Sequence, residues 1–273
     1  DNMEMDIKDK KLFLLDMDGT IYLDDRLFDG VGDFLEKVRE NGGRYIFMTN
    51  NSSKSASDYI AKLATMGIKA GERDFVTSAD AVTDGLTEIY GSPSSAGKIY
   101  LIGTGSFAAQ LVKDGFTITD QPEEDVDILL CGFDRELTYK KLEDGCRLLL
   151  SKRGRSIGFF ASNPDMVCPV EFGYVPDCGS ICGMIETATG RKPLYFGKPA
   201  PRMAEMAMQR TGFSREETLL IGDRLYTDIA CGVNAKIDSC FVLSGEGTLK
   251  DLETSRWQPA IVAEDIRALL SRM

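Results

Sequence analysis

The stretch Leu14-Leu15-Asp16-Met17-Asp18-Gly19-Thr20 places two carboxylates, one residue apart, at the end of an apolar run. Residues 11–15 are typical of a short buried strand, and Asp18-Gly19 is a turn signal that ends it. Side chains two apart on a strand point to the same face, so Asp16 and Asp18 can converge on one small volume. An Asp-x-Asp pair alone is explained at least as well by an acidic surface turn, so partners elsewhere must decide.

Three further polar clusters follow apolar runs. They are Thr49-Asn50-Asn51-Ser52-Ser53 after residues 44–48, Gly197-Lys198-Pro199 after residues 193–196, and the segment from Gly222-Asp223 to Asp228 after residues 218–221. The first of them suits an anion, although an ordinary helix cap explains it equally well. Parallel strands end at one edge of a sheet, where ligands bind in open α/β folds. We therefore expect all these clusters to meet the two carboxylates there.

The alternation of strand and helix patterns predicts an α/β fold with a Rossmann-like, doubly wound parallel sheet. Its core is expected to consist of residues 1–90 and 191–273. A Gly- and Ser-rich linker at 91–97 opens a second α/β series, which we expect to form an inserted domain over residues 91–190. Residues 193–196 are predicted to be the strand with which the core resumes.

The composition excludes several classes of function. With 43% hydrophobic and 27% charged residues, the 273-residue chain is typical of a soluble globular protein. Its net charge of −11 disfavours nucleic acid as a partner. It contains no His, which excludes a His-based triad, a His metal site and a His general base. Seven Cys, an odd number in a long chain, favour reduced thiols and a cytoplasmic location.

Neither targeting nor membrane insertion is indicated. Residues 1–10 are polar and acidic, which is not the pattern of a signal peptide. No apolar run approaches the length of a transmembrane helix. We therefore expect no membrane partner.

Crowded carboxylates at one sheet edge indicate a metal ion. Acids that repel one another have raised pKa values unless a cation offsets them. Mg²⁺ prefers oxygen ligands and accepts substrate phosphate as one of them, which suits Asp16, the backbone carbonyl of Asp18, and Asp223. Lys198 would add a second, fixed positive charge. Such a cluster suits phosphoryl transfer, where catalysis is largely positioning and charge stabilisation.

The order and spacing of these motifs resemble those of the haloacid dehalogenase-like phosphatases, specifically the NagD-type subclass IIA with a large inserted cap. The segment Ser162-Asn163-Pro164-Asp165 is similar to the cap motif of that subclass, and the resemblance covers almost the whole chain. It implies a Mg²⁺-dependent phosphatase whose inserted domain is a cap over the site. One departure is Pro176-Asp177-Cys178-Gly179, where relatives often have a Gly-rich Pro-Gly segment.

The resemblance also implies residue roles. Asp16 would attack phosphorus and form an aspartyl-phosphate, and Asp18 would protonate the leaving oxygen and later deprotonate water. Thr49 would hold the phosphoryl oxygens, Lys198 would steady phosphate and Asp16, and Asp223 would ligate Mg²⁺ with Asp228 as an auxiliary metal residue. Substrate contacts are implied for Gly19, Asn50, Asn51, Asn163 and Asp165.

Two other functions stay open at this point. A phosphorylation-switched signalling domain also uses Asp, Thr and Lys at sheet ends, and a catalytically idle binding protein could keep the fold. For a phosphatase, the partner would be a small phosphate ester. Sugar phosphates, nucleoside monophosphates, phosphoglycolate and pyridoxal phosphate all fit the resemblance, and a homodimer is a possible assembly.

Overall fold

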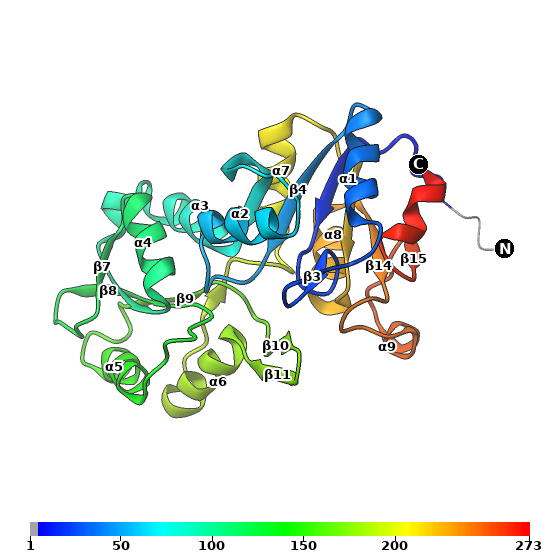
Figure 1. Ribbon diagram of the computed structural model, residues 1–273. Coiled ribbons are helices and arrows are strands. Elements are labelled where there is room, and N and C mark those ends of the chain that lie inside the picture. Colours follow the sequence, from blue (N-terminus) through cyan, green and yellow to red (C-terminus); the bar gives the residue numbers. More distant parts are fainter. Residues whose placement is uncertain (1–4) are drawn as a thin grey trace.

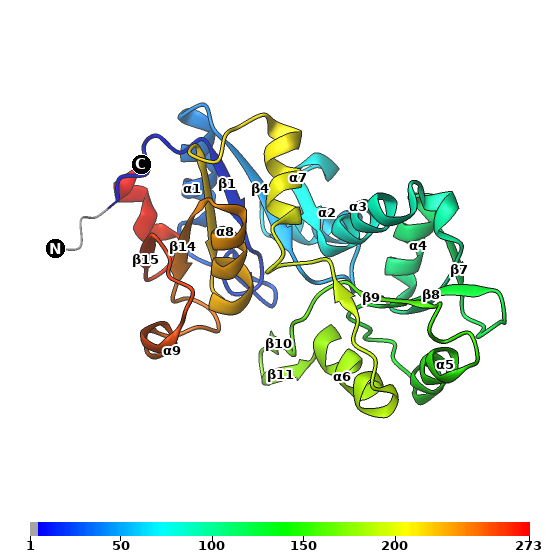
Figure 2. The same cartoon turned by 180° about the vertical axis from the view of Figure 1, so that it is seen from behind.

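The structure is a computed structural model, and it describes residues 5–273. Residues 1–4, which belong to the segment expected not to be a signal peptide, lie outside the described residues. Two parallel sheets, one from each half of the molecule, lie side by side with helices around them (Figures 1 and 2). Among the described residues, no helix is long and apolar enough to cross a membrane.

The first sheet confirms the predicted doubly wound core. Its six strands run in the order β15-β14-β13-β1-β4-β5, and every pair is parallel. They are β1 (Leu12–Leu15), β4 (Arg44–Thr49), β5 (Phe75–Thr77), β13 (Thr218–Gly222), β14 (Asp238–Val242) and β15 (Ile261–Ala263). Strand order reverses between β1 and β13, and ligands bind at such a switch point. Asp16 and Asp223 follow these two strands directly.

Both faces of this sheet are covered. Phe13 and Leu15 of β1 belong to the same buried cluster as α1, whereas Leu12 and Leu14 belong to the cluster of α7. This alternation explains why the strand reads as one continuous apolar run. The helices of the core are α1 (Val31–Glu40), α2 (Ala56–Thr65), α3 (Ser78–Tyr90), α7 (Arg202–Thr211), α8 (Ala230–Ala235) and α9 (Leu249–Thr254), with short helices at Glu72–Asp74, Leu225–Ile229 and Arg267–Arg272.

The second sheet lies in the inserted segment and has the order β12-β9-β8-β6-β7, again with parallel pairs. Its strands are β6 (Lys98–Ile102), β7 (Thr117–Thr119), β8 (Val126–Cys131), β9 (Gly158–Ala161) and β12 (Leu194–Tyr195). Around it lie a short helix at Pro93–Ala96 and helices α4 (Gly105–Lys113), α5 (Tyr139–Leu150) and α6 (Cys178–Thr189). The expectation of an inserted α/β cap domain is confirmed.

One predicted strand belongs to the other sheet. Residues 193–196 were expected to resume the core, but β12 pairs with β9, with Leu194 opposite Phe160 and Tyr195 opposite Ala161. Tyr195 also packs on the apolar cluster of the second sheet. The chain therefore leaves that sheet only after Tyr195, while the domain limits at 91 and 190 stay predictions.

Two small hairpins were not predicted. Strands β2 (Tyr22–Leu23) and β3 (Arg26–Leu27) form one, and β10 (Val167–Val170) with β11 (Gly173–Pro176) forms the other. Strands this short give too few residues for a periodic signal. The β10–β11 hairpin lies beside α6, on the side of the cap nearest to the core (Figures 1 and 2).

The cap and the core share buried apolar contacts. Leu14 and Met48 of the first sheet belong to the same cluster as Leu101 and Leu130 of the second. Helix α3 of the core and helix α4 of the cap lie side by side in both views (Figures 1 and 2). This shared burial holds the cap in a defined position over the carboxyl ends of the core strands.

Candidate active site

Asp16 and Asp18 follow β1 and lie in different environments. The side chain of Asp16 is 13% exposed, and its Oδ1 accepts a hydrogen bond of 2.8 Å from Nζ of Lys198. Asp18 has no hydrogen-bonding partner for its side chain within residues 5–273 and faces the cavity. Burial raises the pKa of Asp18 above its ordinary value. The two carboxylates thus differ in their surroundings, because Asp16 is paired with a buried cation and Asp18 is not.

Lys198 is the buried cation of the site. Its Nζ donates to Asp16 Oδ1 at 2.8 Å, to Asp228 Oδ1 at 2.7 Å and to the carbonyl oxygen of Met48 at 3.2 Å. Burial alone would lower the pKa of Lys198, but the charges of Asp16 and Asp228 raise it above its ordinary value. Asn50 fixes the backbone, because its Oδ1 accepts from Lys198 N and its Nδ2 donates to Lys198 O, each at 2.9 Å. Lys198 is therefore a permanent cation, and its ammonium group is fixed between Asp16 and Asp228.

Two further carboxylates lie close to Asp16 and form a three-acid cluster with it. Oxygens of Asp16, Asp223 and Asp228 lie within 4.8 Å of one another. Burial and the charges of the other two acids raise the pKa of Asp223 well above its ordinary value. Burial and the charge of Asp16 likewise raise the pKa of Asp228 to about 6. Asp223 Oδ1 is buried without a hydrogen-bonding partner in the described chain. A hard divalent cation fits this donor set, because it neutralises the acids and takes the unused oxygen.

Asp18 adds no carboxylate oxygen to this three-acid cluster among the residues described. The metal ligand predicted from the sequence at this position is the backbone carbonyl of Asp18 and not its side chain. This separation agrees with the different environments of the two N-terminal acids.

Glycines hold Asp223 in place. A Cβ at Gly245 would lie 1.9 Å from Asp223 Oδ2, and one at Gly19 would lie 2.5 Å from the same oxygen. The backbone N–H of Glu246 donates to this oxygen at 2.7 Å. Gly19, for which a substrate contact stays a prediction, lies against the Asp223 carboxylate and does not line the cavity. Gly245 was missed, although a Gly-rich turn after β14 was a usable signal.

Replacing Gly245 with Ala should weaken metal binding, because the new methyl group must push the Asp223 carboxylate aside. We expect the Mg²⁺ concentration for half-maximal activity to rise by about 10- to 100-fold, as for other residues that orient metal ligands. Gly183→Ala on α6 is the matched control, because a Cβ there meets nothing within 4 Å. An unchanged Mg²⁺ requirement in Gly245→Ala would contradict the positioning role.

The loop after β4 brings the residues predicted to bind an anion to the cavity. Thr49, Asn50 and Asn51 all line the cavity, and Thr49 Oγ1 accepts from Asn51 N at 3.1 Å. Helix α2 begins only at Ala56, and its N-terminus is closed by a capping box of Ser55 with Asp58. Residues 49–51 therefore precede the helix cap, which uses Ser55 and Asp58, and they lie in the loop before it.

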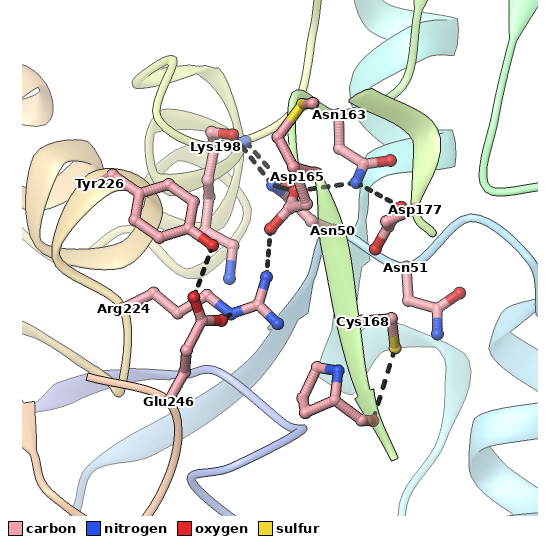
Figure 3. Close-up of polar contacts among 12 residues, drawn as sticks. Asn50, Asn51, Asn163, Asp165, Cys168, Asp177, Lys198, Arg224, Tyr226 and Glu246 are labelled. Carbon is pink, nitrogen blue, oxygen red and sulfur yellow. Dashed lines mark hydrogen bonds and ion pairs between the residues drawn. The ribbon is translucent and has the colours of Figure 1, made fainter. Parts of the chain in front are cut away.

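The cap residues predicted to bind substrate join the cap to the core, and their contact with substrate stays a prediction (Figure 3). Asp165 Oδ2 accepts from Nδ2 of Asn50 and of Asn163, each at 2.8 Å. Its Oδ1 accepts from Arg224 Nη1 at 2.6 Å. Both oxygens of Asp165 are thus used within the protein. Asn163 is fully buried and does not line the cavity.

These elements line a cavity of about 30 Å³ that is partly open to solvent. Its lining consists of Asp16, Asp18, Thr49, Asn50, Asn51, Asp165, Cys168, Pro169, Asp177, Lys198, Arg224 and Thr227. Cys168 and Pro169 belong to β10, so the cap hairpin forms part of the wall of the cavity. Four predicted residues lie outside the lining, namely Gly19, Asn163, Asp223 and Asp228.

The comparisons with family models cover both parts of the core. A model described as haloacid dehalogenase-like hydrolase matches residues 13–117. A second, described as HAD-hydrolase-like, matches residues 195–269. The first match contains Asp16 and Thr49, and the second contains Lys198 and Asp223.

Relatives and solved structures agree with this assignment. An acid sugar phosphatase of Staphylococcus aureus is 30% identical over 267 residues, which are 98% of this chain and 99% of the relative. The structure of a 4-nitrophenylphosphatase from Thermotoga maritima is 39% identical with a TM-score of 0.88, covering 97% of this chain and 98% of its own. A glycerol phosphate phosphatase from Mycobacterium tuberculosis, solved with calcium, is 28% identical with a TM-score of 0.87, covering 97% and 76% respectively. This chain belongs to the haloacid dehalogenase-like hydrolases, among the NagD-type phosphatases.

Proposed function

We propose that the chain is a Mg²⁺-dependent phosphatase that hydrolyses small-molecule phosphate monoesters through an aspartyl-phosphate. The observation that carries the proposal is the cluster of Asp16, Asp223 and Asp228, in which Asp16 is paired with the buried Lys198. Oδ1 of Asp223 is buried there without a hydrogen-bonding partner in the described chain. The named relatives, which are phosphatases, support the reaction class. A homodimer and a cytoplasmic location stay predictions from the sequence.

The metal site would consist of Asp16, Asp223, Asp228 and the backbone carbonyl of Asp18. Bound Mg²⁺ would neutralise charge on the phosphoryl oxygens and on these acids. A structure of the related Mycobacterium tuberculosis phosphatase contains magnesium. In this chain, the excess of acidic over basic groups at the three-acid cluster supports the same kind of ion.

Asp16 is proposed as the nucleophile. Lys198 holds its Oδ1, which leaves Oδ2 to attack phosphorus as the bond from phosphorus to the leaving oxygen breaks. Thr49 and the Asn50 backbone, from the loop after β4, would hold the phosphoryl oxygens during this transfer. Formation of the aspartyl-phosphate divides one difficult hydrolysis into two easier steps.

Asp18 is proposed as the general acid and then the general base. Burial shifts its pKa upward from the ordinary value, which is the direction that suits a group giving a proton to the departing oxygen. The resulting carboxylate then takes a proton from water, whose oxygen attacks phosphorus and releases the Asp16 carboxylate. At the end of the cycle, Asp18 holds a proton again and one phosphate has left.

A turnover experiment tests this function. With Mg²⁺ and p-nitrophenyl phosphate, we expect many turnovers per chain and, after an acid quench, a phosphate adduct on the peptide that contains Asp16. Reduction of the adduct with borohydride should convert Asp16 to homoserine, which mass spectrometry locates. A stable adduct without turnover would favour the signalling domain, and neither adduct nor turnover would favour the idle binding protein.

A further inference from the structure

Two acids of the cap line the cavity, and they differ in their partners. Asp165 forms an ion pair of 2.6 Å with Arg224. Asp177, which is 4% exposed, forms no ion pair within residues 5–273. Its Oδ1 accepts from Asn163 Nδ2 at 3.1 Å and from the backbone N–H of Cys178 (Figure 3). Its second oxygen, Oδ2, has no hydrogen-bonding partner in that range.

Arg224 does not balance this second acid. Its Nη1 donates to Asp165 at 2.6 Å, and its Nε pairs with Glu246 Oε2 at 2.7 Å. One guanidinium is thus shared by two carboxylates, and Tyr226 donates to the other oxygen of Glu246 at 2.9 Å. Figure 3 shows these groups side by side between the cap and the core. The cluster around Arg224 therefore carries a net negative charge.

The remaining cations are used or lie outside the cavity. Lys198 pairs with Asp16 and Asp228. Lys54 and Lys62 lower the pKa of Asp18 from a distance, but neither lines the cavity. Lys62 also faces Asp25 at 3.8 Å. A leaving group in the cavity would meet an acidic wall without a free cation in its lining.

This wall is held rigidly. Asp177 is the N-cap of α6, and Asn163 joins it to Asp165 through one Nδ2 atom. Asp165 is in turn bonded to Asn50 and Arg224 of the core. The acidic wall therefore keeps its position relative to the reaction centre, as an electrostatic filter requires.

We propose that Asp177 selects the leaving group of the substrate, because it excludes leaving groups with a second negative charge and accepts uncharged ones that carry a hydroxyl. A carboxylate placed against Asp177 would be repelled, because like charges across an interface are costly. A hydroxyl could instead donate to Oδ2, since an ionised carboxylate only accepts hydrogen bonds. The inference rests on the proposed phosphatase function.

The charge of Asp177 makes this selectivity pH-dependent. Burial and the charge of Asp165 raise the pKa of Asp177 to about 7. The titratable or charged groups that act on this region are Asp18, Tyr59, Arg135, Asp165, Cys168, Cys178 and Arg224, and of the two arginines only Arg224 lines the cavity. Asp177 is an anion above that pH and neutral below it, so discrimination against anionic leaving groups should increase as the pH rises through about 7.

Glycerol 3-phosphate and 3-phosphoglycerate test the inference, because they differ only in a terminal hydroxymethyl or carboxylate group. At pH 8 we expect kcat/KM to be at least about tenfold higher for glycerol 3-phosphate, and the ratio to decrease towards pH 6. Ionisation of the phosphate affects both esters, so it largely cancels in the ratio. Asp177→Asn should bring the ratio at pH 8 close to its value at pH 6, since Asn keeps the shape and the cap of α6.

Glu171→Gln is the control for charge, because Glu171 is an exposed acid of the cap hairpin and should leave the ratio unchanged. Equal kcat/KM values for the two esters in the wild type, with p-nitrophenyl phosphate hydrolysed, would overturn the inference and leave the proposed function standing. Loss of turnover on all three esters would contradict both. If Asp177→Asn does not fold, the ratio of the wild type and its pH dependence still decide.

Discussion

Replacing Asp16 with Asn is expected to lower kcat for p-nitrophenyl phosphate by about 10⁴-fold or more, as the loss of a covalent nucleophile does. The amide has nearly the same shape, but it lacks the anionic oxygen that would attack phosphorus. Lys198 keeps its contacts with Asp228 and Met48, so the cation of the site should stay in place. The measurement is steady-state release of nitrophenolate at saturating Mg²⁺.

The same substitution should not destabilise the fold. The charge of Asp16 is one cause of the raised pKa values of Asp223 and Asp228, which indicates repulsion among these three acids. Removing one charge should keep or raise Tm in metal-free buffer. Asp29→Asn, at an exposed site, is the matched control for both measurements. Turnover near that of the wild type would contradict the nucleophile assignment, and a lower Tm than that of the wild type would contradict the expected relief of repulsion.

The central part of this architecture could be predicted because local sequence determines it. Strands β1 and β13 are buried on both faces, so each reads as an apolar run, and the acids that follow mark the strand ends. Strand β12 was assigned to the wrong sheet because two residues carry no signal of which neighbour they pair with. Its partner β9 lies more than 30 residues earlier in the chain, and only the packing of Tyr195 determines the pairing.

Some residues of the site could likewise be predicted from the sequence, and others could not. Asp16, Thr49, Lys198 and Asp223 could be named from motifs, because each motif combines a strand end with a chemically distinctive side chain. The role of Asp165 as a link between cap and core was not predictable, since Asn50 and Arg224 contact it from other parts of the chain. The role of Arg224 was not predicted, although this residue lies between Asp223 and Asp228 in the segment that follows β13. Its function depends on two ion pairs that only the folded chain brings together.

Removing Mg²⁺ with a chelator is expected to reduce turnover to background, and added Mg²⁺ should restore it. Without the ion, the oxygens of Asp16, Asp223 and Asp228 lie within 4.8 Å of one another with Lys198 as their nearest cation. The Asp223→Asn variant should show the same loss at ordinary Mg²⁺ concentrations. Full activity in the presence of the chelator would refute the proposed metal site.

Thermal stability gives a second measurement that does not depend on turnover. The pKa of Asp228 is raised from 3.8 to about 6, so the metal-free folded state binds protons more tightly than the unfolded chain. The contribution of Asp228 to the free energy of unfolding of the metal-free protein should therefore be most favourable below about pH 4. It should decrease as the pH rises from about 4 to about 6. Mg²⁺ removes this penalty, so the rise in Tm on adding it should be larger at pH 7 than at pH 5.

The size of that stabilisation follows from binding linkage. At a Mg²⁺ concentration about 100 times Kd, the folded state gains about 2.7 kcal/mol. The Asp29→Asn control should show the full rise in Tm. The Asp223→Asn variant should show only a small rise in Tm, because it lacks one metal ligand. The substitution also removes repulsion among the three acids before any ion binds. Equal Mg²⁺-dependent rises in the variant and the wild type would mean that the ion binds elsewhere, since the buried Asp223 oxygen would then contribute nothing.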